Sequence, residues 1–282
     1  MGEPLDDCLS KLWRVEDQLL HLKELIDAYE ASNPYDIERR DYPPAGKIVF
    51  RLREVVPPPP VIPICVGEIL HNLRSVLDYL ACRLVEETGA SADHKTAFPI
   101  CGTHKEFRSR VAEQLRGIPT AKWKVLEAMQ PYNGPDGKDK HPLTILSTLN
   151  NLDKHRVLPV CQVNTWGGEL VWRCVAPDHS REPGPTLPEL STGAKVVTIL
   201  IRDGTSPGQV PVDVKLAPGV AFGRECGPVE KHHVFQILLA IRSFLYQCVF
   251  VKPGLIEGFD FDSNMRIPAQ PWRGHIFSDP RS

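Results

Sequence analysis

Residues 67–84 read GEILHNLRSVLDYLACRL, and this stretch decides the fold of the 282-residue chain. At about 100° per residue its aliphatic side chains share one broad arc, which predicts a long helix with that face buried in a core. His71, Arg74 and Asp78 lie beside the arc at three- and four-residue spacing, so their side chains are neighbours on the helix. Asp78 can therefore pair with Arg74 or orient His71.

The rest of the chain alternates between helical and extended patterns. Apolar residues at three- and four-residue spacing predict helices at residues 5–29, 64–88, 104–115, 120–129, 141–156 and 228–249. Runs of β-branched residues split by Gly, Pro and Asp predict strands at residues 47–55, 157–163, 169–175, 195–202 and 210–216. Residues 36–46 are polar and proline-bearing, and no element is predicted there. Gly89 is expected to end the second helix.

This order of elements predicts an α+β fold, in which a bundle of long antiparallel helices is interrupted by an antiparallel β-sheet section before its last helix. No internal repeat and no βαβ rhythm is present. Four parts are expected: a helical region at 1–156 with a short strand near 47–55, a β section at 157–227, a C-terminal helix at 228–250 that packs back on the bundle, and an irregular tail at 251–282.

Net charge, cysteine pattern and hydrophobicity limit which kinds of partner the protein is expected to bind. A net charge of −2 gives no whole-molecule attraction to nucleic acid or to an anionic membrane. The eight cysteines include no CxxC pair, and the amino-terminal residues are acidic and amphipathic, so we expect reduced, buried thiols and a cytoplasmic protein. The apolar run 234–251 has Arg242 near its middle and is predicted to be a buried helix, so no membrane partner is expected.

A second polar cluster lies at the end of helix 141–156. Asn151 and His155 share a polar stripe, and Lys154 and Arg156 flank the histidine, whereas Asp153 and Arg156 fall nearer the apolar side and are expected to be partly buried. If this helix packs beside the helix that carries HNLR, two histidines, two arginines and an asparagine converge, which suits an anion such as phosphate. The structural alternative is a surface ion pair and a set of cations that the helix dipole favours.

Four motifs together support a resemblance. GEILHNLRSVLDYL, TAFPI, QPY and LNNLDKHRVL, spread over about residues 60–160, resemble a family of uncharacterised bacterial proteins, many of them actinobacterial. Because the function of that family is unknown, the resemblance implies no activity. A weaker resemblance is to the HEPN group of helical bundles, many of which are metal-independent ribonucleases. The HEPN motif places a histidine four to six residues after an arginine, whereas here His71 precedes Arg74 and His155 precedes Arg156.

Motifs for bound cofactors are absent from the sequence. There is no P-loop, GxGxxG, GxSxG or HExxH, and no cofactor is predicted. Cys101 and His104, with Asp93 and His94 upstream, form one loose set of zinc-ligand types without a second pair, so no metal site is predicted either.

Two functions are therefore considered, and whether the protein is an enzyme stays open. The favoured one is a non-catalytic binding or scaffold protein, in which the His/Arg/Asp clusters bridge helices through buried ion pairs. The alternative is a metal-independent phosphodiesterase or ribonuclease, in which two histidines exchange protons and two arginines stabilise the phosphoryl charge. The partners left open are an anionic ligand, RNA and a second copy of the chain. The candidate site residues are His71, Arg74, Asp78, Asn151, His155 and Arg156.

Overall fold

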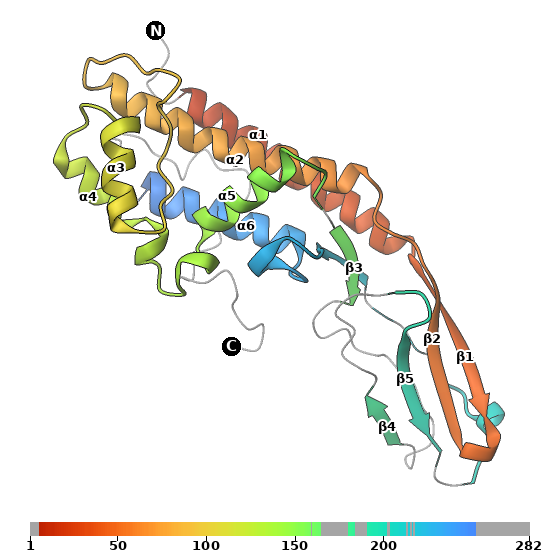
Figure 1. Cartoon of the computed structure of the whole chain (residues 1–282). Helices are drawn as coiled ribbons and strands as arrows, with labels where there is room; N and C mark the ends of the chain where they lie inside the picture. Colours follow the sequence, from red (N-terminus) through yellow and green to blue (C-terminus); the bar gives the residue numbers. More distant parts are fainter. Residues whose placement is uncertain are drawn as a thin grey trace.

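The computed structural model of the chain describes residues 6–158, 160–164, 180–183, 191–201, 204–212, 214, 216 and 218–251. They form an elongated molecule, with a helical body that continues at one end into an arm of β-strands (Figure 1). Helices and an antiparallel sheet therefore occur in one chain, and the predicted α+β class is confirmed.

Six α-helices of the described residues build the body and share one hydrophobic core. They are α1 (Asp6–Ala31), α2 (Val61–Glu86), α3 (His104–Gln114), α4 (Thr120–Ala128), α5 (Pro142–Asp153) and α6 (Val234–Phe244), which continues as a π-helical segment, Leu245–Val251. The paired helices α1 and α2 are antiparallel: Asp7 contacts Arg83 at one end, and the Tyr29 hydroxyl donates to the Val56 carbonyl at the other. In Figure 1, α3 and α4 lie at the end of the body away from the arm.

The ends of α2 follow from its sequence. The helix begins directly after a run of four prolines, and Pro63 occupies its first turn, where the missing N–H has no helical partner to lose. Beyond its last residue, Gly89 has φ +81° and donates its N–H to the Glu86 carbonyl at 2.9 Å. A left-handed residue there favours glycine, as predicted.

In the described residues, two antiparallel sheets complete the fold. Their strands are β1 (Tyr35–Tyr42), β2 (Lys47–Val55), β3 (Val160–Asn164), β4 (Ser180–Pro183), β5 (Lys195–Leu200) and β6 (Pro218–Phe222). The arm has the strand order β1-β2-β5-β4, and β3 pairs with β6 in a separate sheet beside the helical body. The strand near 47–55, which the sequence analysis placed with the helices, thus pairs with β5 from the section 157–227.

The arm has a hydrophobic core of its own. Ile48 is paired with Ile199 and Phe50 with Val197, and alternate residues of both strands pack together. Val210, Val214 and Leu216 also belong to this core. The Tyr35 hydroxyl holds the backbone of Leu216 in place. It donates to the Leu216 carbonyl at 2.6 Å and accepts the Leu216 N–H at 3.1 Å.

Several sequence predictions about strands need correction. Residues 36–46, where no element was predicted, contain most of β1. The predicted strand 210–216 makes no strand in its described residues, because its alternating apolar side chains pack on the arm core without joining a ladder. Strand β6 comes just after it. The predicted strand 169–175 and the predicted tail from residue 252 lie outside the described residues.

The apolar run 234–251 is a buried helical segment, as predicted. Arg242 is 1% exposed and donates from Nε to Glu16 of α1 at 3.0 Å, and the Glu16 side chain is 1% exposed as well. This pair links the last helix to the first. Within the part of the chain that the structure describes, no helix is long and apolar enough to cross a membrane.

His141 makes the stability of the helical body depend on pH. Its Nδ1 caps α5 by accepting the Leu143 N–H at 3.2 Å, and its ring lies edge-on to Phe244. Burial lowers its pKa from 6.5 to about 4, so in acid the unfolded chain binds a proton that the folded chain does not, and stability falls as the pH drops.

We expect a His141→Asn variant, which keeps a capping side chain that does not titrate, to lose about 3 kcal/mol less free energy of unfolding than the parent between about pH 7 and pH 4. Urea denaturation at the two pH values measures the difference. Equal losses in both proteins would contradict the assignment to His141.

Candidate functional site

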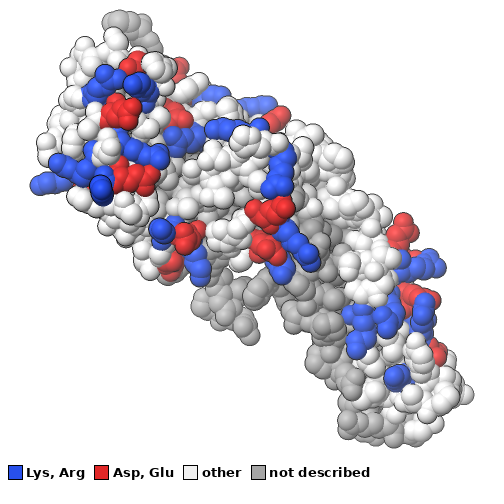
Figure 2. All heavy atoms as spheres, viewed as in Figure 1, with Lys and Arg blue, Asp and Glu red and all other residues white. Residues whose placement is uncertain are grey.

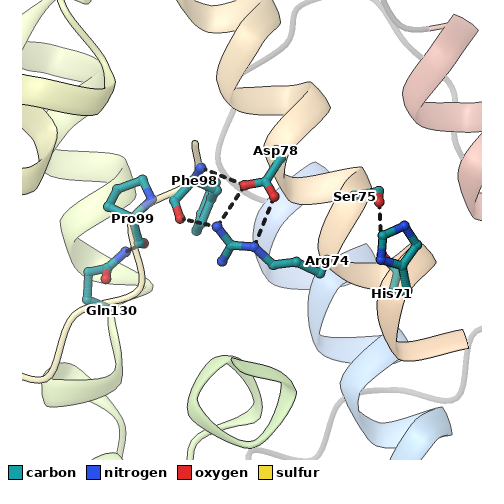
Figure 3. Close-up of polar contacts among 7 residues, drawn as sticks. All are labelled: His71, Arg74, Ser75, Asp78, Phe98, Pro99 and Gln130. Atoms are coloured by element: carbon teal, nitrogen blue, oxygen red, sulfur yellow. Dashed lines mark hydrogen bonds and ion pairs between the residues drawn. The ribbon is translucent and has the colours of Figure 1, made fainter. Parts of the chain in front are cut away.

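Arg74 and Asp78 form the predicted pair, and together they hold the backbone of the connection between α2 and α3 (Figure 3). Arg74 donates to both carboxylate oxygens of Asp78, at 3.0 and 2.7 Å, and also to the Phe98 carbonyl at 3.0 Å. Asp78 accepts the Phe98 N–H at 3.0 Å. One side-chain pair thus satisfies both backbone polar groups of Phe98, as a neighbouring strand would in a sheet.

Gln130 holds the same connection from the other side and is fully buried. Its amide nitrogen donates to the carbonyls of Pro99 and Leu126, at 3.0 and 3.1 Å, and its oxygen accepts the Cys101 N–H at 3.0 Å. The motifs HNLRSVLD, TAFPI and QPY therefore meet in one place. We call this arrangement of Arg74, Asp78 and Gln130 around the connection the Phe98 joint.

A cleft of about 570 Å³ lies between α1, α2 and α5, toward the amino-terminal end of α2. Most of its lining is polar, and Ile64 and Val157 are its large apolar side chains. Both are more than half exposed. The charged and titratable side chains of the cleft are Lys11, Arg14, Glu68, His71, Asp153 and Lys154.

A relay of hydrogen bonds fixes one wall of this cleft. Lys11 donates to the side-chain oxygen Oδ1 of Asn72 at 3.0 Å, the Asn72 amide nitrogen donates to Oε1 of Gln18 at 2.8 Å, and the Gln18 amide nitrogen donates to Glu68 at 3.0 Å. Asn72 and Gln18 are buried between α1 and α2. The Lys11 ammonium and the Glu68 carboxylate are thus each held by a buried amide side chain. Such support by packed side chains is typical of a preorganised polar site.

Gly67 allows α5 to approach α2 closely in the cleft. A Cβ atom at this position would lie 2.3 Å from Oδ1 of Asp153, so any side chain would displace that carboxylate. Asp153 is partly buried, and desolvation raises its pKa while the nearby His71 lowers it. Asp153 and His71 thus both line the cleft at the close contact between the two helices.

The structure separates the predicted site residues into three groups. α2 and α5 are in contact, as the predicted site required, but of the six candidates His71 alone lines the cleft. Arg74 and Asp78 belong to the Phe98 joint. The remaining candidates, Asn151, His155 and Arg156, lie exposed at the end of α5.

Arg156 was expected to be partly buried, and this expectation is wrong. Its side chain is 52% exposed and pairs with Glu225 at 2.7 Å. The helix ends at Asp153, so Arg156 lies beyond the last helical residue and the helical wheel does not apply to it.

Several residues that line the cleft were not among the predicted site residues, above all Gly67 and Asn150. Gly67 had a recognisable signal, because a glycine inside a strongly helical pattern often marks a close packing contact. Asn150 had no such signal, since an asparagine among leucines is also common on an exposed helix face. Lys11 and Arg14 come from α1, whose position beside α2 follows only from the fold.

The possible zinc-ligand types near Cys101 do not gather into a site. His104 instead pairs with Glu127 at 2.5 Å, and Asp93 pairs with Arg116 at 3.0 Å. Throughout the described ranges, no group of three His, Cys, Asp or Glu side chains is placed to hold a metal ion.

Comparisons with known proteins give no family model, no curated protein and no solved structure that matches this chain. A function is therefore proposed from the Phe98 joint and the cleft.

Proposed function

We propose that this chain is a non-catalytic binding or scaffold protein, in which the HNLRSVLD cluster joins helices and the adjacent cleft is the binding region. One observation carries this proposal: Arg74 and Asp78 direct their hydrogen-bonding groups to each other and to the backbone of Phe98. An arginine engaged in this way stabilises the fold and is not presented to a substrate.

Two further observations favour binding over phosphodiester cleavage. The cleavage mechanism needs His71, Arg74 and His155 around one phosphate, whereas His71 alone of these lines the cleft. A polyanion such as RNA is bound best by a continuous basic surface. On the face shown in Figure 2, acidic and basic side chains are interleaved over the helical body.

The proposal includes a cytoplasmic location in a bacterium, and the bacterial origin rests on the family resemblance. Cys8, Cys65, Cys82 and Cys101 are free thiols. Burial raises the pKa of Cys8 to about 12 and those of Cys65 and Cys101 to about 11. Such thiols stay protonated and unreactive, which suits a reducing compartment.

The proposal is tested by incubating the protein with a single-stranded RNA and comparing it with the His71→Ala and His155→Ala variants. We expect no cleavage above the buffer background for any of the three.

We also expect Arg74→Ala to lower the free energy of unfolding by about 1–2 kcal/mol, because the Phe98 carbonyl and the partly buried Asp78 carboxylate lose their donor.

Arg110→Ala is the matched control, because Arg110 forms an ordinary exposed pair with Glu106 one helical turn away. That change should alter stability by only a few tenths of a kcal/mol. Cleavage of RNA by the parent protein that a folded His155→Ala variant lacks would refute the proposal and favour the phosphodiesterase.

A further inference from the structure

The cleft is lined by a mostly buried asparagine whose side chain has no protein partner among the described residues. Asn150 is 4% exposed and lines the cleft from α5, yet its side chain makes no hydrogen bond within the described parts of the chain. Its amide atoms open on the cleft, where ordered water or a molecule that occupies the site can pair with them. An amide presents both donors and an acceptor, so a ligand that pairs with it needs complementary groups of both kinds.

The charges around Asn150 narrow the chemistry of that partner. Arg14 of α1 and Lys154 beyond α5 are exposed cations at the cleft that form no ion pair with any described residue. Together with Lys11 they attract an anionic group. Asp153 and Glu68, however, present carboxylates that can only accept hydrogen bonds, and they repel a bare anion or a polyanion.

We propose that the cleft binds a small metabolite that carries one anionic group and several hydroxyl groups, such as a sugar phosphate or a sugar acid. The anionic group pairs with the cations of Arg14 and Lys154. The hydroxyl groups donate to Asp153 and exchange hydrogen bonds with the amide of Asn150. A cleft of about 570 Å³ is within the usual range for such ligands. This inference rests on the proposed binding function and names its ligand class.

Calorimetric titration with four probes tests the inference: ribose 5-phosphate and gluconate as complete ligands, and ribose and inorganic phosphate as their separate parts. We expect at least one complete ligand to bind at millimolar concentration or below, about tenfold or more tightly than ribose or phosphate alone. Tighter binding of ribose 5-phosphate identifies a phosphate ligand, and tighter binding of gluconate identifies a carboxylate.

Three variants locate the binding in the cleft. Arg14→Gln combined with Lys154→Gln should weaken binding about tenfold or more, because charge-assisted hydrogen bonds are lost. Lys124→Gln removes an exposed cation of α4 that does not line the cleft, and binding should be unchanged. Gly67→Ala leaves the charge unaltered and favours the helix, but its Cβ displaces Asp153, so binding should weaken in a folded protein.

The inference is overturned if neither complete ligand binds, or if binding persists unchanged in both the double variant and Gly67→Ala. These outcomes differ from a failure of the proposed function, which the RNA cleavage assay reports. If the protein neither binds the probes nor cleaves RNA, the proposed ligand class is refuted and the proposed non-catalytic scaffold function stands.

Discussion

Replacing Arg242 by methionine is expected to lower the free energy of unfolding by about 3–5 kcal/mol, as measured by urea denaturation. Arg242 and Glu16 are each 1% exposed, and they join α6 to α1 inside the helical core. Methionine fills much of the same volume but leaves the Glu16 carboxylate buried without its cation. Most of the loss therefore comes from an uncompensated buried charge and not from a cavity.

The double variant Glu16→Leu with Arg242→Met separates these two causes. With both charges removed, no buried charge is left at this contact between α1 and α6, and the double variant should recover most of the stability that Arg242→Met loses. A double variant as unstable as the sum of the two single variants would show that packing, and not the unpaired charge, explains the effect. The free energy of unfolding of Arg242→Lys is expected to lie between those of the parent and of Arg242→Met. Lysine keeps the positive charge but lacks the planar set of N–H donors that arginine has.

The burial of Arg242 could be predicted from the sequence, but the residue that pairs with it could not. A charge in the middle of an apolar helix needs compensation, and this necessity is local. Glu16, however, lies 226 residues earlier, on a helix whose other charged residues are mostly exposed. Only the packing of α6 against α1 distinguishes Glu16 from the exposed acids of the same helix.

Helices and central strands could be predicted because their periodicity reflects a buried face. β1 could not, because its sequence YDIERRDY alternates charges instead of apolar residues. It is an edge strand, and its charges pair locally, as in the Arg39–Asp41 and Arg40–Glu38 contacts. Charged edges of this kind discourage pairing with other chains, so the feature that hides the strand from sequence patterns also protects it.

For the candidate site, the helical wheel predicted which residues are neighbours but not what they contact. His71 and Arg74 are one turn apart, yet His71 lines the cleft and Arg74 binds the backbone of Phe98. The path of residues 96–101 decides this division. That path depends on tertiary packing and is not encoded in the periodicity of α2.

Gln130→Leu is expected to lower the free energy of unfolding by about 3 kcal/mol, more than any single change at Arg74. Gln130 is fully buried, and its amide is the hydrogen-bond partner of Pro99, Cys101 and Leu126. Leucine has a similar volume, so packing is largely kept. The loss comes from buried backbone groups left without partners, which cost more than the hydrogen bonds themselves contribute.

Gln114→Leu is the matched control, because it makes the same substitution where the amide oxygen is buried and has no hydrogen-bond partner. Removing an unsatisfied acceptor should leave the stability unchanged or raise it slightly. Thermal and urea denaturation of both variants, with RNA and sugar phosphate assays alongside, then test the role of the Phe98 joint. If Gln130→Leu is no less stable than Gln114→Leu, the connection at Phe98 is held by its apolar contacts alone, and the HNLRSVLD, TAFPI and QPY motifs need another explanation.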